Sequence, residues 1–189
     1  MTARIAFGSA LSLLCTIALF GGASAQQTPA WSDIDCAQSK IITPPGLKCR
    51  ATQEYAGGTG YWSAGPGGTF RRWTTEGTLN GHKFFYHANE VTSLGSSIME
   101  AKSLQEGLKE MTREARGGSS FSQLGDRGGV DYITFVGADG ESCVGIRKYG
   151  PSVRAGYQWI LNAMRCSPTG KPVPQVEIDR FIAAAGFRG

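Results

Sequence analysis

The side chains best suited to acid–base chemistry in this sequence are its two histidines, His82 and His87. Their spacing of five residues places them on opposite faces of a strand, so they make poor partners for one metal ion. His87 with Glu90 is the best acid–base pair available, but no accompanying motif supports a catalytic role for it. We therefore interpret both histidines as structural or surface residues, and we predict neither a metal site nor a cofactor.

The sequence contains no motif for nucleophilic or nucleotide chemistry. It has no Gly-x-Ser-x-Gly turn and no Gly-Lys-Ser/Thr phosphate loop, and Gly58-Thr59-Gly60 lacks the third glycine of a dinucleotide-binding loop. Carboxylates for glycoside cleavage are present, but their spacing does not indicate which of them approach each other. These carboxylates are Glu54, Glu76, Glu90, Asp126, Asp131, Asp139 and Glu141.

The most distinctive cluster combines aromatic and arginine side chains on a predicted hairpin and on the glycine-rich segment before it. Aromatic rings offer stacking faces and guanidinium groups donate paired hydrogen bonds, which together suit a sugar, a carboxylate or an anionic polymer. In the alternative interpretation, alternate aromatic residues form the core and the arginines line its rim. The predicted ligand-binding residues are Tyr61, Trp62, Arg71, Arg72, Trp73 and His87.

A second group of cations follows later in the chain. Arg147, Lys148, Arg154 and Arg165 surround the segment 149–151. Such a group suits an anionic component of the cell envelope, and it suits solvated strand edges equally well.

Residues 1–25 are typical of a secretory signal peptide. A single cation, Arg4, precedes an apolar stretch over 5–20, and Ala23-Ser24-Ala25 offers small residues for cleavage. The stretch is too short to span a bilayer comfortably, and no second apolar run of 18 residues follows. We therefore expect a periplasmic or secreted protein that has no membrane span after removal of the signal.

The cysteine count agrees with export. Once Cys15 leaves with the signal, Cys36, Cys49, Cys143 and Cys166 remain, and an even number in an exported chain predicts disulfides. Pairing the nearest neighbours in sequence gives Cys36–Cys49 and Cys143–Cys166. A zinc site is disfavoured because there is no Cys-x2-Cys motif, and a catalytic thiol because no cysteine is left over.

Composition predicts one folded domain over 26–189. The chain is 41% hydrophobic, and its 19 basic and 15 acidic residues give a formal net charge of +4, which is mild for a nucleic-acid-binding protein. Within the domain, 26–55 is expected to form an N-terminal flap stapled by Cys36–Cys49. Segment 56–68 is expected to be a loop, since six of its thirteen residues are glycine.

The predicted fold class is α+β, with an antiparallel sheet built from hairpins. Segments 69–79 and 82–88 flank Asn80-Gly81, which favours a two-residue type I′ turn, and 132–136 and 142–148 form a second hairpin. Segment 157–166 fits a strand or a helix. We favour a strand, because pairing with 142–148 brings Cys166 near Cys143.

Two helices are predicted to pack on this sheet. A central amphipathic helix is indicated by apolar residues at steps of three and four, with Ser97 and Glu100 as its capping box and Gly117-Gly118 as its stop. Its apolar positions are Ile98, Ala101, Leu104, Leu108, Met111 and Ala115. A short C-terminal helix begins near Pro174 and carries an apolar stripe of Ile178, Phe181, Ile182 and Ala185.

These features favour an exported, disulfide-stabilised, non-catalytic binding or accessory domain. Its expected partner is an anionic or glycan component of the cell envelope, or an envelope protein, and not a nucleic acid. The alternative is an envelope hydrolase that acts on glycan or peptide, using carboxylates or histidines that only the fold brings together.

Overall fold

The computed structural model describes residues 30–56, 68–153, 156–168 and 172–189, so Tyr61, Trp62 and Arg154 lie outside the described residues. The elements, in chain order, are β1 (Trp31–Ile34), η1 (Cys36–Gln38), β2 (Ile41–Ile42), β3 (Lys48–Thr52), β4 (Tyr55–Ala56), β5 (Thr69–Leu79), β6 (His82–Val91), α1 (Leu104–Met111), α2 (Arg113–Arg116), β7 (Gly125–Asp126), β8 (Asp131–Val136), β9 (Ser142–Tyr149), β10 (Ser152–Val153), β11 (Gly156–Tyr157), β12 (Trp159–Ser167), α3 (Gln175–Ala184) and β13 (Gly186–Phe187).

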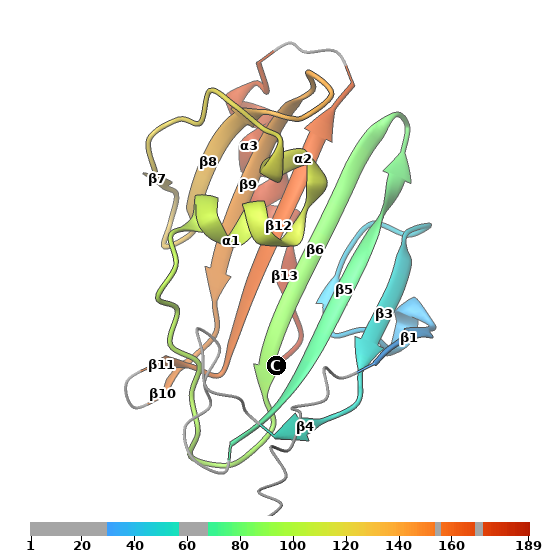
Figure 1. The fold of residues 1–189 in the computed structure, drawn as a ribbon, viewed down its shortest axis with the longest axis vertical. Helices are drawn as coiled ribbons and strands as arrows, with labels where there is room; N and C mark the ends of the chain where they lie inside the picture. The colour runs from blue at the N-terminus through green and yellow to red at the C-terminus, as the bar shows by residue number, and fades with distance from the viewer. Residues whose placement is uncertain (1–29, 57–67, 154–155, 169–171) are drawn as a thin grey trace, which may run out of the picture.

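An antiparallel sheet dominates the described part of the chain. Its strands follow the order β1-β3-β5-β6-β12-β9-β8-β7, and β4 pairs with β5 off this path (Figure 1). Both predicted hairpins are confirmed: β5 pairs with β6, and β8 pairs with β9. Asn80 and Gly81 take positive φ angles of 51° and 76°, as a type I′ turn requires. The strand interpretation of 157–166 is confirmed by β12, which lies between β6 and β9.

Both predicted disulfides are present. Cys143 and Cys166 face each other directly on β9 and β12 with their Cα atoms 4.0 Å apart, and Cys36 in η1 is bonded to Cys49 in β3. Two disulfides are compatible with folding in an oxidising, exported compartment. None of the helices in the described residues is long and apolar enough to cross a membrane.

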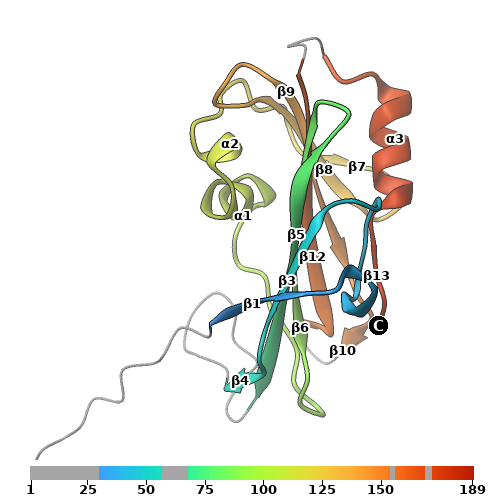
Figure 2. The ribbon, with the colours of Figure 1, turned by 90° about the vertical axis from the view of Figure 1, so that its right-hand side faces the viewer.

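The N-terminal segment expected as a flap is joined to the sheet. β1 and β3 form one edge of the sheet next to β5, and β2 pairs with the C-terminal strand β13. In the view of Figure 2, β1 lies nearly at right angles to β5, with its N-terminal end on the side of the sheet that carries α1.

Helices lie on both sides of the sheet, α1 and α2 on one and α3 on the other (Figure 2). On the α3 side, Ile178, Phe181 and Ile182 pack into a buried cluster with residues of β3, β5, β6, β9 and β12, among them Trp73 and Tyr86. Because side chains alternate along a strand, the residues that separate these cluster residues within each strand face the side of the sheet that carries α1.

Helix α1 approaches the sheet closely enough to require glycine beneath it. Leu104 and Leu108 pack with Ile133 and Met164 in a second buried cluster. A Cβ atom on Gly145 of β9 would lie 2.1 Å from Leu108 Cδ1, inside any real contact distance. Glycine at this position therefore lets the helix backbone and the strand pack together.

The predicted central helix is shorter than expected and begins later. Its capping box is Ser103 with Glu106, rather than Ser97 with Glu100. Ile98 is instead held in an isolated β-bridge with Tyr157, and its side chain is fully buried. The helix also stops at Thr112, which has an extended backbone and caps the separate short helix α2 by accepting a hydrogen bond from Ala115 N.

Candidate functional site

A row of polar side chains crosses the α1 side of the sheet, where an apolar core would be the default. The row follows directly from the strand register, with one residue from each of seven strands: Asp33, Arg50, Thr74, His87, Asn162, Arg147 and Asp131. Helices α1 and α2 lie in front of β9 and β12, whereas none of the described helices lies in front of β3 or β5 (Figure 1). Helices α1 and α2 therefore cover the half of the polar row on β9 and β12, whereas no described helix covers the half on β3 and β5.

In the covered half of the row, Arg147 holds the N-terminal end of α1 against the sheet. Its guanidinium donates hydrogen bonds to Asn162 Oδ1 at 2.8 Å, to the carbonyl oxygen of Lys102 at 2.8 Å and to that of Ser103 at 3.3 Å. It also lies 3.4 Å from Glu100 Oε2, and both side chains of this ion pair are 3% exposed. Burial raises the pKa of Glu100, while the charge of Arg147 opposes this shift. This part of the row has a structural role.

The second group of cations does not form one surface. Arg147 is buried on the α1 side, whereas Lys148 and Arg165 are on the α3 side. There Lys148 Nζ donates to the carbonyl oxygen of Ala185, and Arg165 binds Glu177 at 2.7 Å. These cations have intramolecular partners.

The predicted ligand-binding residues within the described range are divided between the two faces of the sheet. Arg71 and Trp73 face α3, whereas Arg72 and His87 face the α1 side, because adjacent strand residues alternate. His87 and Glu90 are separated in the same way, so the acid–base pair considered above does not form. The contacts on each face show which of these residues remain accessible to a ligand.

On the α3 side, Trp73 and Arg71 belong to a closed internal network. Trp73 is 3% exposed and donates from Nε1 to Glu90 Oε2 at 3.1 Å, while Lys40 pairs with the other oxygen of Glu90. The Arg71 guanidinium lies 4.3 Å from the centre of the Trp73 ring, and its Nε donates to the carbonyl oxygen of Thr52. The geometry of these two residues therefore agrees with the alternative interpretation, in which the aromatic residue belongs to the core and the arginine lines its rim.

On the α1 side, Arg72 stands without an acidic partner among the described residues. Its guanidinium lies 5.2 Å from the centre of the Tyr55 ring, and its Nε has no hydrogen-bond partner in the described part of the chain. Asn89, directly opposite on β6, is 1% exposed and has no partner there for Nδ2. Arg72 Nε and Asn89 Nδ2 are thus buried donors without an acceptor among the described residues, and each unmatched buried donor costs about 1–3 kcal/mol.

Beside Arg72, three side chains from distant parts of the sequence come together. The rings of Trp31 and His87 meet edge to face with centres 6.0 Å apart, and the Arg50 guanidinium lies 5.9 Å from the Trp31 ring. Asp33 is occupied by Arg50 at 3.3 Å and by Lys48 at 3.1 Å. We call the group Trp31, Arg50, Tyr55, Arg72 and His87 the open face.

His87 is an uncharged member of the open face. Burial and the positive charge of Arg72 lower its pKa to about 4, against an ordinary value of 6.5, although a hydrogen bond with Asn89 opposes this shift. The imidazole is therefore neutral at pH 7. A neutral ring adds no repulsion to an incoming cation and no attraction to an anion, so the charge of this face comes from Arg72 and from Arg50, of which Arg50 is paired with Asp33.

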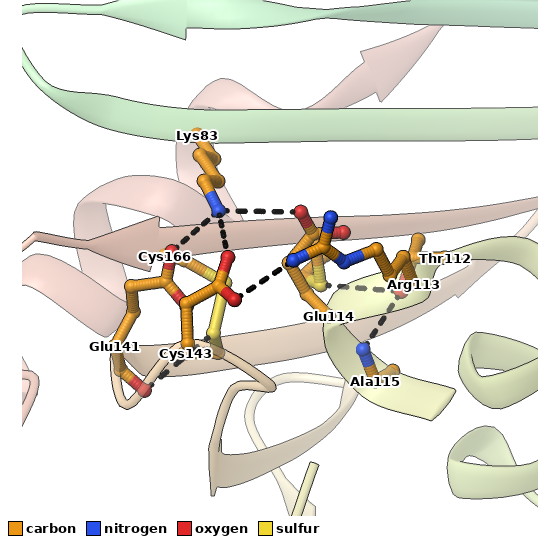
Figure 3. Close-up of polar contacts among 10 residues, drawn as sticks. Lys83, Thr112, Arg113, Glu114, Ala115, Glu141, Cys143 and Cys166 are labelled. Atoms are coloured by element: carbon orange, nitrogen blue, oxygen red, sulfur yellow. Dashed lines mark hydrogen bonds and ion pairs between the residues drawn. A yellow bond between two sulfur atoms is a disulfide. The ribbon is translucent and has the colours of Figure 1, made fainter. Parts of the chain in front are cut away.

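A second polar cluster, which the sequence did not reveal, surrounds Lys83 (Figure 3). The Lys83 ammonium lies 2.5 Å from Glu141, 3.1 Å from Asp139 and 3.4 Å from Glu114, and Arg113 binds Asp139 at 2.8 Å. Three carboxylates raise the pKa of Lys83 above its usual range, mainly through Glu141. A lysine held protonated is a poor nucleophile, so this group is a charged tie between β6, α2 and the β8–β9 turn.

The position of Lys83 in this cluster follows from the pairing register of β6 with β12, and not from a local sequence motif. Lys83 lies opposite Cys166, which is bonded to Cys143, and Glu141 precedes Cys143 by two residues. Pairing of β6 with β12 would have placed Lys83 next to the β8–β9 turn, but that pairing had not been predicted.

Among the described residues, no three His, Cys, Asp or Glu side chains are placed to hold a metal ion.

Comparison with known proteins returns no relative. No protein-family model matches the chain, and no curated protein or solved structure is significantly similar to it. A function is therefore inferred from the residues of the site.

Proposed function

We propose that this protein is an exported, periplasmic, non-catalytic binding domain that recognises an acidic glycan of the cell envelope through its open face. The signal-like segment 1–25 and the two disulfides support the exported location. The observation that carries the proposal is Arg72, whose guanidinium lies 5.2 Å from the centre of the Tyr55 ring, with no carboxylate partner among the described residues and with the unmatched donor of Asn89 opposite.

The chemistry of the open face favours a carboxylate-bearing sugar. An arginine whose guanidinium is already held beside an aromatic ring loses little side-chain entropy when it binds a carboxylate in the bidentate geometry. Trp31 and Tyr55 flank the arginines and offer apolar faces on which a sugar ring can stack.

Calorimetric titration with oligogalacturonate, a carboxylate-bearing glycan, tests the proposal. A neutral oligoglucan of equal length is the ligand control. We expect the acidic glycan to bind and Arg72→Gln to weaken that binding about tenfold or more, as expected for the loss of a charged hydrogen bond. Arg127→Gln, the same charge change at an exposed ion pair with Asp179, should bind as the wild type does. Equal binding of both glycans, or undiminished binding by Arg72→Gln, contradicts the proposal.

A further inference from the structure

A cleft of about 300 Å³ lies between the β5–β6 hairpin and helix α2, apart from the residues of the open face. The residues of its lining that concern us are Glu76, Thr78, Lys83, Phe85, Glu114 and Met164. The volume is at the lower end of the range for small-molecule sites, so the cleft suits one side chain or a small ligand.

The lining of the cleft includes apolar groups. Phe85 is partly buried and packs against the α1-side core, and Met164 is 1% exposed. An aromatic ring and a thioether offer contact to aliphatic carbon and no oxygen ligand for a hard cation such as Ca²⁺. A ligand of this cleft therefore needs an apolar portion.

The polar part of the lining is acidic. Glu76 is exposed and makes no ion pair within the described residues, because Lys48, its cross-strand neighbour on β3, is occupied by Asp33. Glu114 shares the Lys83 ammonium with Asp139 and Glu141, which hold Lys83 toward the β8–β9 turn (Figure 3). Lys83 is thus already neutralised, whereas Glu76 has no cationic partner among the described residues.

The charges around the cleft do not balance. The charged residues of its lining are two carboxylates, Glu76 and Glu114, and one cation, Lys83, which is already paired with Asp139 and Glu141 outside the cleft. This local excess of negative charge stands on a chain whose formal net charge is +4. An anion is repelled here, and a cation is attracted.

We propose that this cleft binds a guanidinium or ammonium group carried on an aliphatic chain. The aliphatic chain packs on Phe85 and Met164, and the cationic end pairs with Glu76, with Thr78 at its side. A cation near the face of the Phe85 ring gains a further attraction. This site is separate from the acidic-glycan site of the open face and holds whether or not that proposal is correct.

Methyl NMR of protein labelled at the methionine ε-carbons tests this assignment, with Met99 and Met111 as internal references. The cationic probes are N-acetyl-arginine methylamide, which represents a polypeptide side chain, and spermidine, which represents a free polyamine. N-acetyl-norleucine methylamide is the neutral probe. We expect both cationic probes to shift the Met164 methyl resonance saturably and the neutral probe to leave it unchanged; the tighter of the two identifies the source of the cation.

Two variants locate the cation within the cleft. Glu76→Gln should weaken binding of the tighter cationic probe about two- to fivefold, because it removes an unpaired charge at an exposed position. Glu110→Gln, which makes the same change on the outer surface of α1, should bind as the wild type does. The proposal is overturned by an unmoved Met164 signal at probe concentrations up to about 10 mM, by an equal response to the norleucine probe, or by wild-type affinity in Glu76→Gln.

Discussion

Neighbouring residues on β5 have opposite environments because their side chains alternate between the two faces of the sheet. Arg71 and Trp73 are satisfied internally by Thr52 and Glu90, whereas Arg72 stands on the other side without an acceptor for its Nε among the described residues. The aromatic and arginine composition of this segment indicated a binding site. The alternation of side chains divides these residues between the two faces: Arg71 belongs to the internal network on the α3 side, and Arg72 belongs to the open face.

His87 gives the protein a stability that depends on pH. Its pKa is about 4 in the folded chain and about 6.5 in the unfolded chain, so below pH 6.5 the unfolded chain binds a proton that the folded chain does not. The free energy of unfolding therefore falls as the pH falls from about 6.5 to 4. We expect His87 to contribute a loss of about 2 kcal/mol, somewhat less than the full shift implies because the ring is only partly shielded from water.

Urea denaturation at pH 7 and at pH 4.5 measures this contribution. His87→Gln should lose less stability between the two pH values than the wild type does. If the wild type and His87→Gln lose the same amount, the imidazole titrates normally and is not buried as described.

At the scale of elements, the strands were predictable because their signals are local. Asn80-Gly81 determines the β5–β6 turn, and the disulfide between Cys143 and Cys166 requires β12 to lie beside β9. The start of the helix was not predictable in this way. Two Ser-x-x-Glu motifs, at Ser97 and at Ser103, compete for the same capping role.

Tertiary contacts select between these two motifs. Ile98 pairs with Tyr157 and is buried, which takes the backbone after Ser97 out of helical geometry. Arg147 then binds the carbonyl oxygens of Lys102 and Ser103. The open face was only partly predictable for the same reason, since Trp31 and Arg50 reach it through the pairing of β1 with β3 and of β3 with β5.

Removal of the Arg147 guanidinium tests how α1 is attached to the sheet. Arg147→Met should lower the free energy of unfolding by about 3–5 kcal/mol, because it leaves the Glu100 carboxylate buried without its cation. Adding Glu100→Gln should restore part of the loss. Chemical denaturation of both variants checks this, and a loss below about 1 kcal/mol in the single variant would show that the pair is solvated.

At the scale of the whole molecule, the two disulfides differ in their access to solvent. Cys36 is exposed in η1, whereas Cys143 and Cys166 are 0% and 1% exposed beneath the helix layer. Reduction requires attack by a thiolate on an accessible sulfur. The Cys36–Cys49 disulfide at the edge of the sheet should therefore be reduced before the Cys143–Cys166 disulfide at its centre.

Brief exposure of the native protein to dithiothreitol, followed by alkylation and peptide mapping, checks this order. We expect label at Cys36 and Cys49 first, with Cys143 and Cys166 protected until the protein unfolds. Loss of the Cys143–Cys166 bond should then cost about 2–5 kcal/mol of stability. Equal rates of labelling at all four cysteines would contradict the burial of the central bond.

The two candidate sites differ in charge: guanidinium groups lie on the open face, and the carboxylates of Glu76 and Glu114 line the cleft beside α2. Along β5, Arg72 and Glu76 are four residues apart and on the same face, about 13 Å from one site to the other.

The most direct test of the account is the Nε–H resonance of Arg72, followed by ¹⁵N NMR during titration with oligogalacturonate. This donor has no partner in the described part of the chain, so a carboxylate that binds the open face should shift its resonance saturably. The Nε–H resonance of Arg127, already paired with Asp179, should stay in place. An Arg72 signal that does not move while the glycan binds would place the binding site elsewhere and contradict the central claim.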